Sequence, residues 1–503
     1  MSKISLSPNA SGTGTFTIQS PAGNTNRTFT LPDADGELSV GGGGSIELTA
    51  AGDISNGDAV GITPDGLASV LSIVAQDAVQ FEAGSANFVD GGVVYDTNSN
   101  KVVIVYSDAG NSNRVTGVVG TISSGAITFG TPVVINSTVN CYTSCATFDS
   151  TNNKVVCYYR DSGAGAIKSH VLTVSGTSLT VGTANTVHTS ANAYSEIKCT
   201  FDSSANRTVV FARETNGITE AFVGTVSGTS ISHGSPVVFE SDTLREIDCT
   251  FDSTNNKVIV FYRRTADDII YAKVGTVSGT SISFGARASA LSSGTGFVPK
   301  STFDSENGKV VMSYITPYST TPRTGYISVG TVSGTSISFG AIVEFDGDDP
   351  SAGTDNRKLV FNPSSNKVEI YFSAGTSISL KTGTVSGTSI TIDPSKKLFG
   401  DDTGYLGAAY DPVSNLTIVA IRDSAGDAIV VNSGAVSAFL GLAESDITDG
   451  ANGSITVVGG TNESQTGLAA GSAVYSDGDG TISDVANGTS IGVALSATKI
   501  LLT

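Results

Sequence analysis

The segment FDSTNNKVIVFYR, residues 251–263, decides the fold because it recurs along the chain. Close copies begin at residues 148, 201 and 303, and looser copies begin at 95, 361 and 410. One acidic or amide position marks every copy: Asp96, Asp149, Asp202, Asp252, Asp304, Asn362 and Asp411. Successive marker residues are 53, 53, 50, 52, 58 and 49 positions apart. Self-similarity at this period indicates a repeat architecture of seven units.

A second motif, GTVSGTSISFG at 275–285, has counterparts in every unit except the seventh. Each unit then reads as strand, polar turn, strand, variable loop, strand, tight turn and strand, because apolar residues alternate between turn-forming Asn, Gly and Ser. Four antiparallel strands in about 50 residues make one propeller blade. We predict an all-β, seven-bladed β-propeller of four-stranded repeats. A solenoid stays open, whereas β-sandwiches need seven or more strands per unit.

The seventh unit lacks its last strand, so closing the ring requires a strand from elsewhere. Residues 67–76, LASVLSIVAQ, alternate as a strand does, and we expect residues 67–80 to lie beside 428–434.

The regions outside the repeats predict the domain organisation. GDAVGITPDGLAS (57–69) aligns without gaps to GSAVYSDGDGTIS (471–483), which indicates related hairpins on both sides of the repeats. The predicted domains are listed in chain order: an extended arm with a Gly linker at 1–44, a hairpin module at 45–70, the propeller at 71–434, and a small β-domain at 435–503 that packs with 45–70.

Composition excludes several functions. The 503 residues carry 15% charged residues and a formal net charge of -19, so the surface as a whole repels nucleic acid and anionic membranes. No apolar run approaches the roughly 20 residues needed to span a bilayer. We expect no nucleic-acid partner, no membrane insertion, and small buried thiols rather than a disulfide framework at the five cysteines.

The loops between the second and third strands differ in every unit, which makes their face of the ring the candidate for recognition. Four arginines end second strands on this face: Arg160, Arg213, Arg263 and Arg422. They could bind an anionic glycan, or be neutralised by the acids that follow three of them, Asp161, Glu214 and Asp423. Five aromatic residues on the same face would suit sugar stacking, although isolated surface aromatics are ordinary: Tyr142, Tyr194, Phe297, Tyr318 and Tyr326.

Catalytic motifs are weak. The three histidines have no metal-ligand spacing, and the repeated Asp-box pattern of sialidases does not occur. We therefore predict no enzyme activity, no metal and no cofactor. A glycosidase with paired carboxylates stays an alternative, because distance and not sequence defines such pairs.

The flanks resemble parts of tailed-phage virion proteins. The segment at 13–38, TGTFTIQSPAGNTNRTFTLPDADGEL, is similar to the N-terminal segment of phage fibre proteins. The segments at 54–70, 439–460 and 492–502 are similar to modules that surround propeller repeats in phage tail proteins. Coiled-coil heptads and collagen-like repeats, which many fibres carry, are missing from this sequence.

The resemblance implies a tail-fibre or adhesin-type virion structural protein on the tail or particle surface, made in the host cytoplasm. It further implies a homotrimer, docked to other virion proteins through residues 1–44, whose propeller binds a host cell-surface glycan or envelope protein. The alternatives are a purely structural subunit, such as a capsid decoration, and a polysaccharide-degrading enzyme.

Overall fold

The computed structural model describes residues 44–50, 54–62, 68–70, 74–75, 78–84, 86–87, 91–123, 126–138, 140–190, 192, 194–291, 294–316, 323–349, 357–374, 377–393, 396–399, 406–421, 427–432, 440–448, 450–476, 482–484 and 489–503. Within these ranges the one helical element is a 3-10 turn, η1 (Ala109–Asn111), and everything else regular is strand. No helix in the described part is long and apolar enough to cross a membrane. The predicted arm, residues 1–44, lies outside the described residues except for Gly44.

The first four repeats each form one antiparallel sheet. The first contains β6 (Ala86–Asn87), β7 (Val93–Asp96), β8 (Lys101–Asp108), β9 (Arg114–Ser123), β10 (Ala126–Phe129) and β11 (Val133–Val134). The second contains β12 (Cys141–Asp149), β13 (Lys154–Asp161), β14 (Ala166–Ser175), β15 (Ser178–Val181) and β16 (Asn185–Thr189). The third contains β17 (Tyr194–Asp202), β18 (Arg207–Glu214), β19 (Thr219–Ser227), β20 (Ser230–His233) and β21 (Val237–Glu240). The fourth contains β22 (Leu244–Asp252), β23 (Lys257–Arg264), β24 (Ile269–Ser278), β25 (Ser281–Phe284) and β26 (Ala288–Ser289).

The last three repeats follow the same order. The fifth contains β27 (Phe297–Asp304), β28 (Lys309–Thr316), β29 (Arg323–Ser333), β30 (Ser336–Phe339) and β31 (Val343–Asp349). The sixth contains β32 (Arg357–Asn362), β33 (Lys367–Ala374), β34 (Ser377–Ser386), β35 (Ser389–Ile392) and β36 (Lys396–Phe399). The seventh contains β37 (Leu406–Asp411), β38 (Leu416–Ile421), β39 (Asp427–Asn432), β4 (Val74–Ala75) and β5 (Val79–Gln80). In each sheet two short strands share the outermost position, and both pair with the same neighbouring strand, as β15 and β16 pair with β14.

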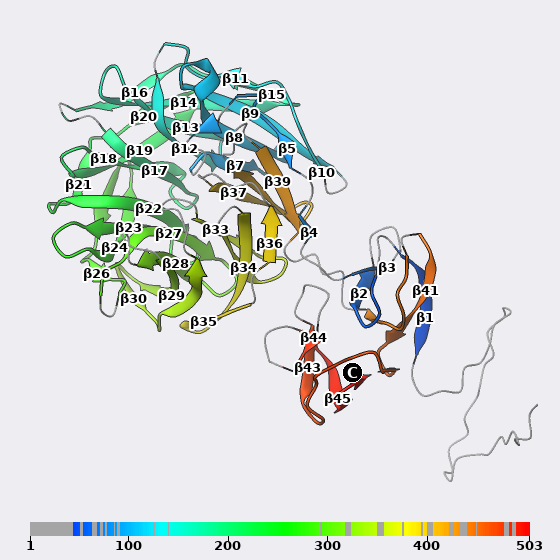
Figure 1. Cartoon of the computed structure of the whole chain (residues 1–503). Coiled ribbons are helices and arrows are strands. Elements are labelled where there is room, and N and C mark those ends of the chain that lie inside the picture. The colour runs from blue at the N-terminus through cyan, green and yellow to red at the C-terminus, as the bar shows by residue number, and fades with distance from the viewer. Residues whose placement is uncertain are drawn as a thin grey trace, which may run out of the picture. The chain divides into compact units, whose positions relative to one another are not determined.

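The sheets are arranged in a ring (Figure 1). Each innermost strand contacts the innermost strand of the next repeat, from β7 through β12, β17, β22, β27 and β32 to β37, and β37 contacts β7. The all-β propeller prediction is confirmed, and the circular order of contacts is consistent with seven blades.

The outer strands of the seventh sheet, β4 and β5, come from residues that precede the first repeat. Val74 pairs with Asn432, and Val79 pairs with Ala428. The prediction that residues 67–80 lie beside 428–434 is confirmed for residues 74–75 and 79–80. The closing strand begins later than predicted, however, because Ala68–Val70 form β3 in a different sheet.

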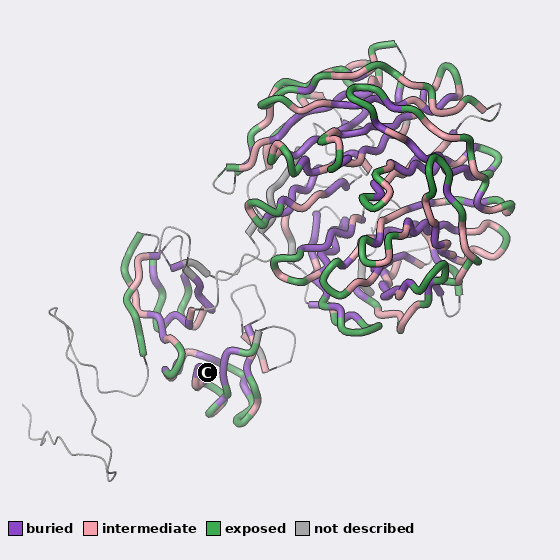
Figure 2. The backbone as a smooth tube through the Cα atoms, turned by 180° about the vertical axis from the view of Figure 1, so that it is seen from behind, coloured by how far each residue is buried: buried purple, intermediate pink, exposed green. Residues whose placement is uncertain are grey.

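The hydrophobic core consists of one cluster between each pair of neighbouring sheets. In one example, Phe211 of the third sheet and Tyr262 of the fourth are both fully buried in the same cluster. Another joins Ile104 of the first sheet to Ile418 of the seventh, so the core also closes. Buried residues run along the strands throughout the ring (Figure 2). The five cysteines are free thiols, as predicted, and three of them are buried: Cys141, Cys145 and Cys157.

The marker residue of every repeat caps the turn after the innermost strand. Asp252 Oδ1 accepts hydrogen bonds from the backbone N–H groups of Thr254 and Asn255, both at 2.9 Å. The same two bonds, to the second and third residues along, form at the other six markers. The turn ends on a residue with positive φ, such as Asn256 at 55°, where Asn or Gly is favoured. This chemistry explains why DSTNNK changes so little between copies.

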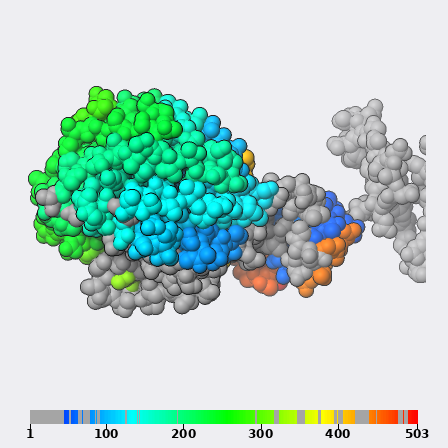
Figure 3. Space-filling view, turned by 90° about the horizontal axis from the view of Figure 1, so that it is seen from above, coloured from blue at the N-terminus to red at the C-terminus, as the bar shows by residue number. Residues whose placement is uncertain are grey.

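The two flanks form five-stranded sheets with identical topology. The first module consists of β1 (Ser45–Thr49), β2 (Ala59–Ile62), β3 (Ala68–Val70), β40 (Gly441–Ala443) and β41 (Asn452–Val457). The second module consists of β42 (Thr461–Asn462), β43 (Ala473–Ser476), β44 (Ile482–Ser483), β45 (Thr489–Ser496) and β46 (Lys499–Leu502). Their strand orders are β1-β41-β40-β2-β3 and β42-β46-β45-β43-β44, so each strand has a counterpart in chain order. Atoms from both ends of the chain, blue and orange, therefore lie together in this region (Figure 3).

The pairing register is also the same in the two modules. Equivalent pairs are Val60 with Gly441 and Val474 with Gly492; Gly61 with Ser69 and Tyr475 with Ser483; Leu442 with Thr456 and Val493 with Leu501. A Cβ on Gly441 or Gly492 would come within 2.0 or 2.2 Å of a carbonyl oxygen on the neighbouring strand, so both positions require glycine. The propeller is thus inserted between the third and fourth strands of the first of two related modules.

Removing one turn cap should destabilise the ring measurably. Asp252 is fully buried, so Asp252→Ala leaves two turn N–H groups without their acceptor and should lower the free energy of unfolding by about 1–3 kcal/mol. Asp252→Asn keeps an Oδ1 acceptor, as Asn362 does in the sixth repeat, and should cost less. Urea unfolding followed by circular dichroism measures both; equal losses would contradict the capping role.

Buried His170 and half-buried His233 predict a loss of stability on mild acidification. Burial lowers the pKa of His233 to about 4, and burial also lowers the pKa of His170. Unfolded histidine titrates near pH 6.5, so between about pH 6.5 and 4 the unfolded chain binds more protons and stability falls as the pH falls.

The variant His233→Phe isolates this effect. Phe occupies the equivalent position in the next unit, at Phe284, so the ring environment should accept it. The midpoint of urea unfolding should fall less steeply between pH 6.5 and 4 in this variant than in the parent chain. An unchanged slope would show that His233 is not the group responsible.

Candidate functional site

A pocket of about 430 Å³ lies among the innermost strands of the third to seventh sheets. Its lining residues are Thr200, Cys249, Thr250, Ser301, Thr302, Phe303, Ser305, Lys358, Leu359, Val360, Phe361, Pro363, Ala408 and Tyr410. Ser305 and Pro363 belong to the capped turns, so the pocket lies toward the turn face of the ring and not toward the variable loops. The sequence analysis did not predict a site here.

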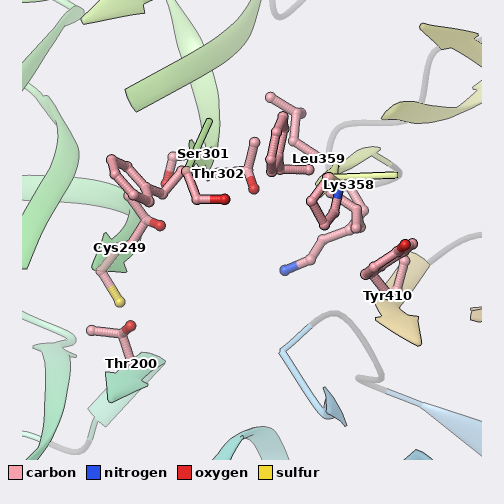
Figure 4. A pocket seen from close by; sticks show the side chains of 14 residues that line it. Thr200, Cys249, Ser301, Thr302, Lys358, Leu359 and Tyr410 are labelled. Atoms are coloured by element: carbon pink, nitrogen blue, oxygen red, sulfur yellow. The ribbon is translucent and has the colours of Figure 1, made fainter. Parts of the chain in front are cut away.

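The pocket is polar and carries a cation. Lys358 extends its amine into the open space, together with the Cys249 thiol and the Thr302 hydroxyl (Figure 4). Burial raises the pKa of the Cys249 thiol, and the Asp248 carboxylate raises it further, so this sulfur stays protonated and is a poor nucleophile. The pocket offers hydrogen-bond donors to a small anion.

Lysines also occupy the position of Lys358 in other repeats. Lys198 and Lys300 lie four residues before their marker residues, as Lys358 does, and Lys300 is buried. Asp248 holds this position in the fourth repeat, and its carboxylate accepts bonds from the backbone N–H and hydroxyl of Ser301, both at 2.7 Å. Three repeats thus carry a lysine at this position of the innermost strand, and of these three side chains Lys358 lines the pocket. The constant distance of four residues between each of these lysines and its marker residue is a pattern that the sequence alone shows.

On the variable-loop face, two of the predicted arginines join neighbouring strands and blades. Arg263 makes a two-pronged contact with Glu246, at 2.8 and 2.9 Å, and also pairs with Asp268. Glu246 in turn accepts the backbone N–H of Val298, on the innermost strand of the next sheet, at 2.9 Å.

Arg213 repeats this arrangement one blade earlier. Its Nε lies 3.3 Å from Glu196, and Glu196 accepts the N–H of Ile247 in the fourth sheet at 2.8 Å. The two guanidinium groups hold carboxylates that bridge blades, and they do not form an open cluster. The bridging acids, Glu196 and Glu246, come from the innermost strand of the same sheet, whereas the sequence analysis named the acids that follow three of the arginines.

These bridges coincide with bulges in the innermost strands. Glu246 has φ of 51° at a register shift between Arg245 and Ile247, and Val298 has φ of 52° at a shift between Phe297 and Lys300. Positive φ is costly for a β-branched residue such as valine. The bulges bend the first residues of the innermost strands, next to the segments that join successive blades.

The remaining two predicted arginines are Arg160 and Arg422. Arg160 is the penultimate residue of β13 and is half-buried. Asp161 beside it accepts the N–H groups of Gly163 and Ala164 and lies 3.9 Å from Lys168. Arg422 lies outside the described residues.

The predicted stacking aromatics occupy different environments. The expectation of a sugar-facing ring is wrong for Tyr194, which is fully buried, with its hydroxyl donating to Glu220 at 2.8 Å. Tyr326 is half-buried and stacks on Tyr314, with ring centroids 5.4 Å apart. Phe297 is half-buried beneath the Arg263 guanidinium, 4.8 Å from its ring centroid. Tyr142 lies in β12, and Tyr318 lies outside the described residues.

Among the described residues no group of three or more His, Cys, Asp or Glu side chains is arranged to hold a metal ion.

Comparison with solved structures finds distant neighbours. A mutant of AofleA from Arthrobotrys oligospora is 12% identical over 67% of this chain and 95% of its own, with a TM-score of 0.44. The β-propeller domain of a protein from Myceliophteria thermophila is 5% identical over 72% of this chain and 99% of its own, with a TM-score of 0.44. A Hadza microbial sialidase is 10% identical over 73% of this chain and 69% of its own, with a TM-score of 0.42.

Comparison with sequence families gives one informative match. Residues 411–499 match the family model described as phage cement protein. No curated protein matches the chain. The matched segment includes the end of the seventh sheet, β40 and β41 of the first module, and most of the second module. This match indicates a phage virion structural protein.

Proposed function

We propose that this chain is a virion-surface protein in which the paired modules attach to the phage particle and the propeller presents its variable loops to the host cell surface. The observation that carries the proposal is the position of the phage cement match, which falls largely on the strands of the two modules. The duplicated modules and the propeller consist of different sheets, which suits a division between attachment and display.

The insertion point supports this division. The second module connects its third and fourth strands through residues 484–488, whereas the first module connects the equivalent strands, β3 and β40, through the whole propeller. An insertion between two strands of one sheet leaves the host module intact when the inserted domain is rigid and closed. The particle-binding part can therefore stay constant while the displayed part changes.

The variable-loop face supports the display role. The bulges and the Arg263–Glu246 and Arg213–Glu196 contacts fix the ends of the innermost strands, and loops on rigid supports are common recognition sites. Exposed apolar side chains occur there, including Ile218 at 39% exposure. Because the arginines are already paired, recognition by these loops would depend more on shape and apolar contact than on a cluster of free cations.

The attachment proposal predicts that the modules act without the propeller. Replacing residues 71–439 with their counterpart by register in the second module, residues 485–490, should give a folded β-domain. This variant should bind particles that lack the protein with the occupancy of the full chain, as measured by cosedimentation. A folded variant that fails to bind would contradict attachment through the modules.

Deleting residues 1–44 from the full chain and from this variant decides the role of the arm. Loss of particle binding only after this deletion would support the sequence-based prediction that the arm docks to the virion. Unchanged binding would assign attachment to the modules alone.

The display proposal predicts that one face of the ring binds host cells. The double substitution Ile218→Glu with Ala266→Glu, on exposed variable-loop positions, should weaken binding of the full chain to host cells at least tenfold. The matched control, Ser203→Glu with Thr254→Glu, adds the same charge to exposed positions of the turn face and should leave binding unchanged.

Flow cytometry with labelled protein measures the binding. A parent chain that does not bind host cells would favour the purely structural subunit, and release of reducing sugar ends from surface glycan would favour the enzyme.

A further inference from the structure

The pocket among the innermost strands repeats one residue type at one position of neighbouring repeats. The residue two places before the marker is a threonine in the third, fourth and fifth repeats: Thr200, Thr250 and Thr302. All three line the pocket and are half-buried. Because the innermost strands of these repeats contact one another in order, the three residues form a row along one wall, which we call the threonine row.

The side of the pocket that the sixth and seventh sheets form is mostly apolar. Val360 takes the place of the threonine in the sixth repeat, and it is buried together with its neighbours Leu359 and Phe361. Ala408 and the ring of Tyr410 continue this side in the seventh sheet. A ligand of this pocket therefore meets hydrogen-bonding groups on one side and an apolar surface on the other.

Lys358 adds a positive charge to this apolar side. Its amine extends into the open space, across from Thr200 and Cys249 (Figure 4). Within the described part of the chain, no hydrogen bond or ion pair joins this amine to another residue. Lys198 and Lys300, at the equivalent position of other repeats, each interact with another group. The Lys358 amine is thus directed at the space that a ligand would fill.

The hydroxyl groups of the threonine row are available in the same way. None of the three hydrogen-bonds to another residue that the structure describes. A half-buried hydroxyl group beside an open pocket can exchange bonds with water for bonds with a ligand. Because a hydroxyl group both donates and accepts, the row matches a ligand that carries hydroxyl groups of its own.

The charges around the pocket favour an anion. Asp248 is buried, and its carboxylate already accepts the backbone N–H and the hydroxyl of Ser301. Burial raises the pKa of the Cys249 thiol, and Asp248 raises it further. Lys198 and Lys358 lower the same pKa, so the charges of both amines reach the pocket wall.

We infer that this pocket binds a small organic acid whose body carries hydroxyl groups, the chemistry of a sugar acid. The carboxylate lies against Lys358 Nζ, and the hydroxyl groups lie along the threonine row. The cavity volume of about 430 Å³ falls within the roughly 300–1,000 Å³ that small-molecule sites occupy. The inference does not depend on the proposed virion role, which uses the variable loops and the modules.

Isothermal titration calorimetry of the full chain at low salt tests the inference with glucuronate and galacturonate. At least one of these acids should bind at one molecule per chain with a dissociation constant of about 1 mM or lower. Glucose has a comparable body without the acid, and acetate has the acid without the body. Each should bind at least about tenfold more weakly, since each lacks one set of contacts. Failure of both sugar acids to bind, or equal affinity for glucose or acetate, would overturn the inference.

Substitutions in the pocket assign the contacts. Lys358→Met removes the charge from a half-buried side chain and should weaken binding of the acid by about tenfold or more. Thr302→Val imitates Val360 of the sixth repeat and should weaken binding about two- to tenfold. The matched control is Lys257→Met, which removes a half-buried lysine outside the pocket lining and should bind as the parent does. Circular dichroism verifies that each variant is folded. A folded Lys358→Met chain with the parent's affinity would contradict the proposed contact.

Cys249 reports where the acid binds. Its thiol lines the pocket, so a bound acid should slow its alkylation by iodoacetamide, measured by peptide mass spectrometry on the native full chain. Half-maximal protection should occur at the dissociation constant found by calorimetry, and glucose at the same concentration should not protect. Binding that leaves the alkylation rate of Cys249 unchanged would place the acid elsewhere and overturn the inference.

Discussion

The ring depends on a buried acceptor at the end of each innermost strand. The marker side chain takes two backbone N–H groups of the following turn, in the same geometry at all seven positions. This cap sets where the second strand starts and therefore its register against the first. Register in turn decides which side chains reach the clusters between blades, because a shift of one residue exchanges the two faces of a strand. The core of the propeller is thus fixed by a small polar interaction at its edge.

The sequence predicts those parts of the fold in which the same local interactions recur in every repeat. The capped turn and the positive-φ residue after it leave a fixed sequence signature, and period-two alternation gives the strands. The function of Arg213 and Arg263 was not predictable in the same way. Their partners, Glu196 and Glu246, are 17 residues away in each case, on the strand that pairs with the strand of the arginine. Each of these carboxylates also accepts a backbone N–H from the next sheet, and only the ring brings that group near. The burial of Tyr194 has a similar origin, because its place in the cluster between the second and third sheets depends on packing between repeats.

The pocket among the innermost strands could be predicted only in part. Lys198, Lys300 and Lys358 recur at one distance from the marker, so the pattern was visible, but its meaning requires the ring. Only closure brings strands from five repeats around one cavity. The duplicated modules are intermediate between these cases. The aligned segments showed that the hairpins are related, while the shared strand order, and the place where the propeller interrupts it, required the pairing of β40 and β41 with β1 and β2.

The composite seventh sheet has a mechanical consequence. The segments that lead to the modules leave the ring next to β4 and β39, and these strands pair with each other. If the modules and the propeller were each bound to a different partner, tension between them would enter the ring through this single blade. The segment before β4 and the segment after β39 would share the force. The other six sheets would carry none of it through their covalent connections. The strength of the β4–β39 and β5–β39 pairing would then set the force at which the ring opens, independently of how tightly either end is bound.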